Sequence, residues 1–169
     1  CFIGAGRTLA DFRLLAMDMD STLITIECID EIADMQGLKA QVSEITEAAM
    51  RGELDFAASL TRRAALLEGL DASALARVYA ERLRISMGGE AMLAAVQAAG
   101  LKTLLVSGGF TFFTERLQQR LGLDYAHANV LEIENGRLTG RVVGGIVDAE
   151  EKRRTVEKVC AELGIPASQ

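Results

Sequence analysis

Two short apolar runs, at residues 14–17 and 102–107, have the length of a β-strand, and each gives way abruptly to polar residues or glycines. Runs of this kind are typical of strands that are buried in a parallel sheet. The first is followed by two closely spaced aspartates, and the second ends in a serine that precedes two glycines. In open α/β sheets, ligands bind just beyond the carboxyl ends of the strands, so we expect the chemistry of this protein at these two points.

Much of the remaining chain has apolar residues at spacings of three and four, which predict amphipathic helices. Residues from about 27 to 85 keep this period and show no strand pattern. Within them, Asp71 is placed to cap a helix that begins at Ala72. Further helices are predicted from after Gly88-Gly89 to about residue 99, over 111–121 and over about 150–163.

One stretch departs from the helical pattern. Residues 129–133 and 137–143 contain β-prone runs, and they flank the dipeptide Asn135-Gly136. Asn-Gly between two such runs is a strong signal for a β-hairpin. The combined pattern predicts an α/β fold, in which the core carries a β-hairpin and a helical insert that covers the active site.

Composition limits the possible functions. The chain has 169 residues, and its 50% hydrophobic and 25% charged residues are typical of one globular domain with a modest insert. A net charge of −6 argues against a protein that binds the phosphate backbone of nucleic acids. The sequence shows neither an apolar run of transmembrane length nor a signal-peptide pattern. We therefore expect no nucleic acid and no membrane among the partners.

The cysteines favour a reducing compartment. Cys1, Cys28 and Cys160 are odd in number and form no Cys-x-x-Cys motif, so reduced thiols in the cytoplasm fit best. Cys28 lies near the acidic pair, but the single histidine, His127, is far away in sequence. A buried thiol at Cys28 is therefore favoured over a nucleophile.

The pair Asp18 and Asp20, followed by Ser21 and Thr22, carries the main candidate chemistry. Neighbouring carboxylates repel each other, and a hard divalent cation commonly offsets their charge. An aspartate can also attack phosphorus as a nucleophile, while a second acid handles the proton of the leaving group. The same residues suit a simple turn in which side chains hydrogen-bond to the backbone. From these residues alone, both interpretations stay open.

Three stretches of the chain together resemble the motifs of a known family. Residues 17–23 read Met-Asp-Met-Asp-Ser-Thr-Leu, and residues 107–109 read Ser-Gly-Gly. They resemble the first and second motifs of the haloacid-dehalogenase superfamily, and specifically those of its phosphoserine phosphatases. Lys152 stands where the family keeps its lysine, although a shift of one or two residues would place Arg153 or Arg154 there. The likeness extends from about residue 13 to the C-terminus.

This resemblance implies a Rossmann-like parallel-sheet core of the haloacid-dehalogenase type, made of residues 13–24 and 86–169. It implies that residues 25–85 are a helical cap and that residues 1–12 are a leader, which could be the remnant of an upstream domain. The family also carries a fourth motif, Gly-Asp-Gly-x-x-Asp, and no such stretch follows Lys152. We therefore expect the C-terminal part of the core to be missing from these residues.

The resemblance also assigns roles at the active site. Asp18 would be the nucleophile, and Asp20 the acid that protonates the leaving group and then activates water. Dehalogenases of the superfamily lack an acid at the position of Asp20, so phosphoryl chemistry is favoured. Ser107 and the amide of Gly108 would bind the phosphoryl group, and Lys152 would neutralise its charge. Mg²⁺ is the implied cofactor, with Asp18 and the backbone carbonyl of Asp20 as its protein ligands.

Substrate-binding residues would come from the cap. By resemblance, Glu27 would meet the ammonium group of phosphoserine, and Arg63 its carboxylate. The neighbouring Arg62 is the alternative to Arg63, and both arginines could simply be solvated. Met50 and Phe56 would shield the pocket, although at helical spacing they could equally lie in the core.

The function implied by this resemblance is the Mg²⁺-dependent hydrolysis of O-phosphoserine to serine and phosphate through an aspartyl-phosphate, the last step of serine biosynthesis. The partner would be this small-molecule substrate, and a homodimer stays open. Two rival hypotheses remain: a related phosphotransferase that shares every motif, and a non-catalytic fragment that lacks the final metal-binding motif.

Overall fold

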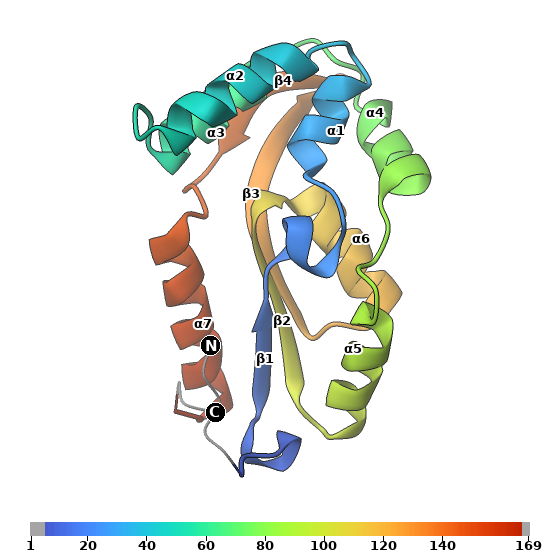
Figure 1. The fold of residues 1–169 in the computed structure, drawn as a ribbon, viewed down its shortest axis with the longest axis vertical. Coiled ribbons are helices and arrows are strands. Elements are labelled where there is room, and N and C mark those ends of the chain that lie inside the picture. The colour runs from blue at the N-terminus through green and yellow to red at the C-terminus, as the bar shows by residue number, and fades with distance from the viewer. Residues whose placement is uncertain (1–5, 167–169) are drawn as a thin grey trace.

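The computed structural model describes residues 6–166 and shows a sheet with helices on both of its faces (Figure 1). The strands lie in the order β1-β2-β3-β4 and span Leu14–Met17, Lys102–Phe110, Tyr125–Glu134 and Arg137–Val143. β1, β2 and β3 are parallel, and β4 is antiparallel to β3. The predicted α/β class, parallel core and hairpin are therefore confirmed. Residues 1–5 of the predicted leader, with Cys1, and residues 167–169 lie outside the described residues.

The hairpin is a continuation of the core sheet. β3 first runs parallel to β2, with Leu104 opposite Tyr125, and then pairs with β4. At the turn, Asn135 and Gly136 adopt φ angles of 51° and 75°, as the hairpin turn favoured by Asn-Gly requires. The sequence predicted only the second half of β3, because residues 125–128 carry no apolar run. Pairing with β2 makes this segment a strand despite its composition.

Three helices cover the sheet (Figure 1): α7 (Ala149–Leu163) lies on one face, and α5 (Gly89–Ala98) and α6 (Thr111–Leu121) lie on the other. Side chains of β2 alternate between the two layers, because successive residues of a strand point to opposite faces. Leu105 shares a core with Phe113 of α6, whereas Leu104 and Val106 pack with Val159 of α7. A short 3-10 turn, η1 (Leu9–Asp11), precedes β1.

The predicted helical insert lies beyond the carboxyl ends of β1 and β2 (Figure 1). Its elements are α1 (Cys28–Asp34), α2 (Lys39–Met50), α3 (Phe56–Ala65), α4 (Ser73–Arg77) and a π-helical turn, η3 (Val78–Arg82). The two linkers to the core run side by side, and the Thr25 N–H donates to the Arg84 carbonyl at 3.0 Å. The Asp71 carboxylate accepts a hydrogen bond from the Ser73 N–H at 2.9 Å, close to the predicted capping position.

The hairpin also contacts the insert. Leu138 of β4 accepts a backbone hydrogen bond from Gly69 and donates one to Leu70, both at 2.8 Å. Gly140 approaches the end of α3 so closely that a Cβ atom there would lie 3.0 Å from the Cβ of Glu68. Gly140 also has a φ of +75°, which favours glycine. The contact between β4 and the end of α3 therefore joins the core and the insert at a place other than the linkers. The boundary between core and cap, at residues 25 and 85, remains a proposal.

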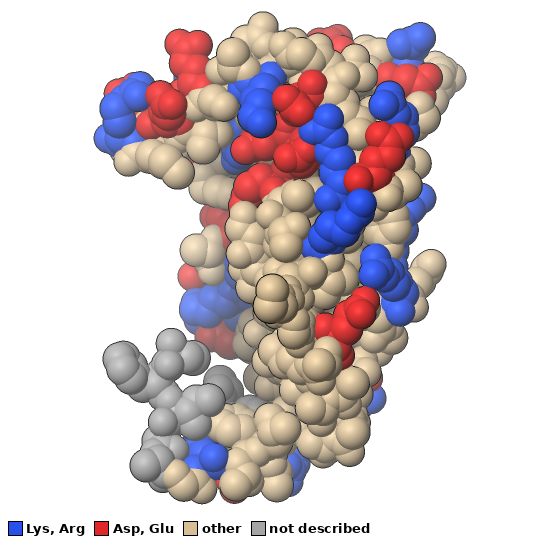
Figure 2. Space-filling model, turned by 45° about the vertical axis from the view of Figure 1, so that its right-hand side comes forward, with Lys and Arg blue, Asp and Glu red and all other residues tan. Residues whose placement is uncertain are grey.

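Charges of both signs are mixed on the face shown in Figure 2, more densely in its upper part. Within the insert, Arg82 lies 2.5 Å from carboxylate oxygens of both Glu31 and Asp34. The positive charge of Arg82 is therefore offset by two neighbouring carboxylates. Among residues 6–166, no helix is long and apolar enough to cross a membrane.

Candidate active site

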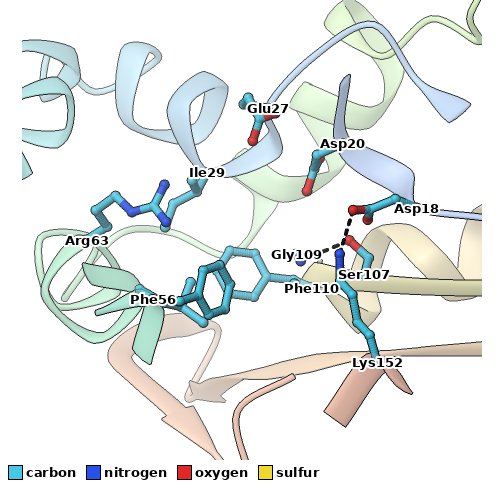
Figure 3. Close-up of a pocket in the computed structure, with 12 residues that line it drawn as sticks. Asp18, Asp20, Glu27, Ile29, Phe56, Arg63, Ser107, Gly109, Phe110 and Lys152 are labelled. Carbon is cyan, nitrogen blue, oxygen red and sulfur yellow. Dashed lines mark hydrogen bonds and ion pairs between the residues drawn. The ribbon is translucent and has the colours of Figure 1, made fainter. Parts of the chain in front are cut away.

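A pocket lies where the carboxyl ends of β1 and β2 meet the insert and the start of α7 (Figure 3). Every predicted site residue except Met50 lines it, namely Asp18, Asp20, Glu27, Phe56, Arg63, Ser107, Gly108 and Lys152. The other lining residues are Ile29, Leu60, Gly109 and Phe110. Segments far apart in the sequence therefore meet at one place, as expected for the carboxyl edge of a parallel sheet.

Helical periodicity could not separate pocket residues from core residues in the insert. Met50 ends α2, is 84% exposed and does not line the pocket. Ile29 and Leu60 share the helical spacing of core residues such as Ile32 and Ala64, yet they also line the pocket. An apolar stripe shows only that one side of a helix is covered, and not whether protein or ligand covers it.

Asp18 follows β1, and its carboxylate points toward Lys152 (Figure 3). Its Oδ2 atom lies 2.5 Å from Lys152 Nζ, and its Oδ1 atom accepts a hydrogen bond from the Met19 N–H at 2.8 Å. The carboxylate is therefore oriented by two contacts, one from the backbone and one from a cation. Such fixed orientation is what nucleophilic attack requires.

The residues next to Lys152 on α7 have other partners. Arg153 forms ion pairs with Glu150 and Glu157, and Arg154 pairs with Glu150. The first turn of α7 thus carries Lys152 into the pocket, while both arginines remain on the outer surface of the helix.

Asp20 lies in an irregular turn, η2 (Met19–Leu23), and its carboxylate points into the pocket (Figure 3). Burial raises the pKa of Asp20 to about 6, and the negative charges of Glu27 and Asp18 act in the same direction. A hydrogen bond from the Cys28 N–H, at 3.1 Å, opposes this rise in pKa. A carboxyl group with a pKa this close to neutrality can donate a proton and later accept one.

The raised pKa of Asp20 predicts a pH-dependent contribution to stability in metal-free buffer. Because the pKa rises from 3.8 to about 6 on folding, this contribution is fully present below pH 3.8 and is lost as the pH rises through about 6. We expect the stability of the wild type relative to Asp20→Asn to fall by about 3 kcal/mol across this range, measured by denaturant unfolding. A relative stability that is constant or rises with pH would contradict the assigned environment.

Ser107, Gly108 and Gly109 bring the backbone of β2 close to the pocket. The Ser107 side chain is buried, and its Oγ atom accepts a hydrogen bond from the Gly109 N–H at 2.9 Å. A Cβ atom on Gly109 would lie 2.5 Å from Asp20 Oδ2, and one on Gly108 would lie 2.7 Å from Phe56 Cζ. Glycine at both positions therefore lets the acid and the aromatic ring approach the backbone.

Glu27 and Arg63 lie on the insert side of the pocket, away from Lys152 (Figure 3). The Ser21 hydroxyl donates to Glu27 Oε1 at 2.6 Å. The Nε atom of Arg63 is buried and has no hydrogen-bond partner within residues 6–166. A buried N–H without an acceptor is unfavourable, so a hydrogen-bond acceptor on a bound ligand would satisfy this position. Arg62 is exposed and does not line the pocket.

The oxygen donors of the pocket fit a hard divalent cation. Asp18 supplies a carboxylate, and the family resemblance adds the backbone carbonyl of Asp20, whose side chain stays free to carry a proton; Mg²⁺ is commonly bound by one or two carboxylates together with water and substrate phosphate. In the described part of the chain, no three His, Cys, Asp or Glu side chains converge to hold a metal by themselves. The donor set therefore fits Mg²⁺ shared with a bound phosphate better than a closed protein cage.

Comparisons with known proteins agree with this arrangement. A phosphoserine phosphatase from Albidiferax ferrireducens is 55% identical over 166 residues, which are 95% of this chain and 70% of that protein. A phospho-aspartyl intermediate analogue of phosphoserine phosphatase has a similar structure, with a TM-score of 0.85 and 36% identity over 92% of this chain and 74% of that chain. A substrate-bound phosphoserine phosphatase complex has a TM-score of 0.85 and 35% identity over 92% and 73%. Because the sequence model for haloacid dehalogenase-like hydrolases matches residues 15–168, the chain belongs to that family.

Proposed function

We propose that the protein is a phosphoserine phosphatase, which hydrolyses O-phosphoserine to serine and phosphate through an aspartyl-phosphate on Asp18. One observation carries this proposal: Asp18 faces Lys152 and shares a pocket with Asp20, while Glu27 and Arg63 line the insert side of the same pocket. The first group of residues suits phosphoryl transfer, and the second suits a zwitterionic amino acid.

The reaction belongs at the last step of serine biosynthesis, with O-phosphoserine as the small-molecule partner. We place it in the cytoplasm, where free thiols stay reduced. Cys28 and Cys160 are both free and buried, which is consistent with that compartment.

In the first step, a carboxylate oxygen of Asp18 attacks phosphorus, and the bond between phosphorus and the serine oxygen breaks. The departing oxygen takes the proton of Asp20, whose pKa of about 6 leaves a fraction of the molecules protonated near neutral pH. Serine leaves, Asp18 carries the phosphoryl group, and Asp20 is ionised.

In the second step, Asp20 takes a proton from water, and the water oxygen attacks phosphorus. The bond between phosphorus and Asp18 breaks, which releases inorganic phosphate and restores both carboxyl groups to their starting states. One water molecule is consumed in the complete cycle. The same residue thus acts first as an acid and then as a base.

Positive and hydrogen-bonding groups stabilise the phosphoryl oxygens in both steps. Lys152 Nζ lies 2.5 Å from Asp18, so charge on the phosphoryl group develops next to the ammonium. The Ser107 hydroxyl and the Gly108 N–H bind the remaining oxygens from the end of β2. When Mg²⁺ is bound by Asp18 and Asp20, it supplies further positive charge at the same place.

The insert side of the pocket recognises the amino-acid part of the substrate. Arg63 offers a planar donor group to the carboxylate, and its unpaired Nε–H provides a donor that this group would satisfy. Glu27 accepts from the ammonium group, and the Ser21 hydroxyl orients Glu27. Apolar side chains of Ile29 and Leu60 line the same pocket and suit a short aliphatic carbon chain.

Replacing Arg63 with methionine is expected to lower kcat/KM for phosphoserine by about 10²-fold, because a hydrogen-bonded charge pair is lost. The kcat/KM for phosphoethanolamine, which lacks the carboxylate, should fall little, and Arg62→Met is the matched control for removal of a positive charge from α3.

Glu27→Gln is expected to lower kcat/KM for phosphoserine and to have little effect on 3-phosphoglycerate, the analogue that lacks the ammonium group. Equal losses for all three phosphate esters would contradict the assignments of Arg63 and Glu27.

Phosphate release, measured with and without an added alcohol, separates hydrolysis from phosphotransfer.

A further inference from the structure

Asn129 is a buried polar residue in β3 that does not line the pocket and that nothing in the sequence marked as functional. Its side chain is buried, and both ends of its amide bind backbone groups. Nδ2 donates to the Gly108 carbonyl at 2.7 Å, and Oδ1 accepts from the Val147 N–H at 2.8 Å. Because the Gly108 carbonyl is an acceptor and the Val147 N–H is a donor, they fix the orientation of the amide, with Nδ2 toward Gly108 and Oδ1 toward Val147.

The first contact holds the phosphate-binding end of β2. The peptide between Gly108 and Gly109 is planar, and it is held on both sides. Asn129 binds its carbonyl oxygen, and Ser107 Oγ accepts from its N–H at 2.9 Å. Because the Ser107 oxygen is used as an acceptor by this peptide, its own hydrogen remains available to donate to a phosphoryl oxygen.

The second contact holds the start of α7. Val147 precedes Asp148, whose carboxylate caps the helix by accepting from the Glu151 N–H at 2.9 Å. The Asp148 carbonyl accepts from the Lys152 N–H, also at 2.9 Å. The position of Val147 therefore sets where the first turn of α7 begins and where the Lys152 side chain enters the pocket.

We propose that Asn129 is a positioning residue for phosphoryl transfer. It sets the spacing between the phosphate-binding end of β2 and the first turn of α7, so that Ser107 and Lys152 reach the same phosphoryl group. This inference rests on the proposed function. Only a side chain with a donor at one end and an acceptor at the other satisfies both backbone groups. An aspartate at position 129 would have the same shape, but its ionised carboxylate would repel the Gly108 carbonyl.

Asn129→Asp tests this role. We expect kcat for phosphoserine to fall by about tenfold to 10²-fold at neutral pH, while KM rises by a smaller factor, because the residues that bind the amino-acid part are unchanged. The ratio of variant to wild-type kcat should recover as the pH is lowered, because a protonated carboxyl group can again donate to Gly108. Binding of inorganic phosphate, measured by calorimetry, should weaken in the same pH-dependent way.

Thr103→Val is the matched control, because it removes a buried hydroxyl that binds Asp124 near the other end of β2. If both variants lose similar stability, only Asn129→Asp should lose kcat. Asn129→Ala gives the same comparison without a buried charge if Asn129→Asp does not fold. Losses of kcat that match those of Thr103→Val, or that do not change with pH in Asn129→Asp, would overturn the inference. Failure of the wild type to hydrolyse phosphoserine would instead refute the proposed function, and phosphate binding would still test Asn129.

Discussion

Asp18→Asn is expected to lower kcat for phosphoserine hydrolysis by about 10⁴-fold or more, because an amide cannot attack phosphorus. The fold should survive, since asparagine has nearly the same shape and its oxygen can still accept from the Met19 N–H. The loss should therefore appear in steady-state phosphate release, while circular dichroism and the unfolding transition change little.

Asp34→Asn is the control for this substitution. It removes a carboxylate from the insert that pairs with Arg82 and does not line the pocket, so turnover should stay close to that of the wild type. Sustained turnover by Asp18→Asn would refute the assigned nucleophile. A comparable loss in Asp34→Asn would show that general changes in charge, and not the nucleophile, limit the rate.

Asp20→Asn is expected to lower kcat for phosphoserine by about 10²- to 10⁴-fold, because both proton transfers pass through this carboxyl group. Asparagine can still accept the hydrogen bond from the Cys28 N–H, so the turn that holds residue 20 should persist. The loss should depend on the leaving group. An aryl phosphate with an acidic phenol needs no proton to leave, so its first step should be less affected than that of phosphoserine.

The second step still needs a base, whatever the leaving group. Asp20→Asn should therefore release a burst of phenol that is stoichiometric with enzyme and then turn over slowly, as stopped-flow absorbance would show. Equal losses for phosphoserine and the aryl phosphate, with no burst, would be inconsistent with a residue that acts as acid and then as base.

The sequence predicted those parts of the fold that have a local signal. The helix over 111–121 and the turn at Asn135-Gly136 lie where periodicity and turn chemistry placed them. The positions of Asp18, directly after β1, and of Ser107, near the end of β2, were also indicated, because polar residues there interrupt an apolar run. The resemblance then placed Lys152, whose charged neighbours look alike in sequence.

Features that depend on contacts between distant segments could not be predicted in this way. The first half of β3 becomes a strand through pairing with β2, and Gly140 is required by the nearby end of α3. Met50 and Leu60 have similar helical contexts, yet only Leu60 reaches the pocket. Asn129 carries no local signal at all, because its partners lie 21 and 18 residues away.

The central claim is that Asp18 receives the phosphoryl group. Rapid quenching of the protein with phosphoserine, followed by borohydride reduction and peptide mass spectrometry, tests it directly, since borohydride reduces the acyl phosphate and converts the phosphorylated aspartate to homoserine. We expect the reduced product at residue 18 in the wild type, in larger amount in Asp20→Asn, and not in Asp18→Asn. Label at another residue, or turnover without any label at residue 18, would contradict the account.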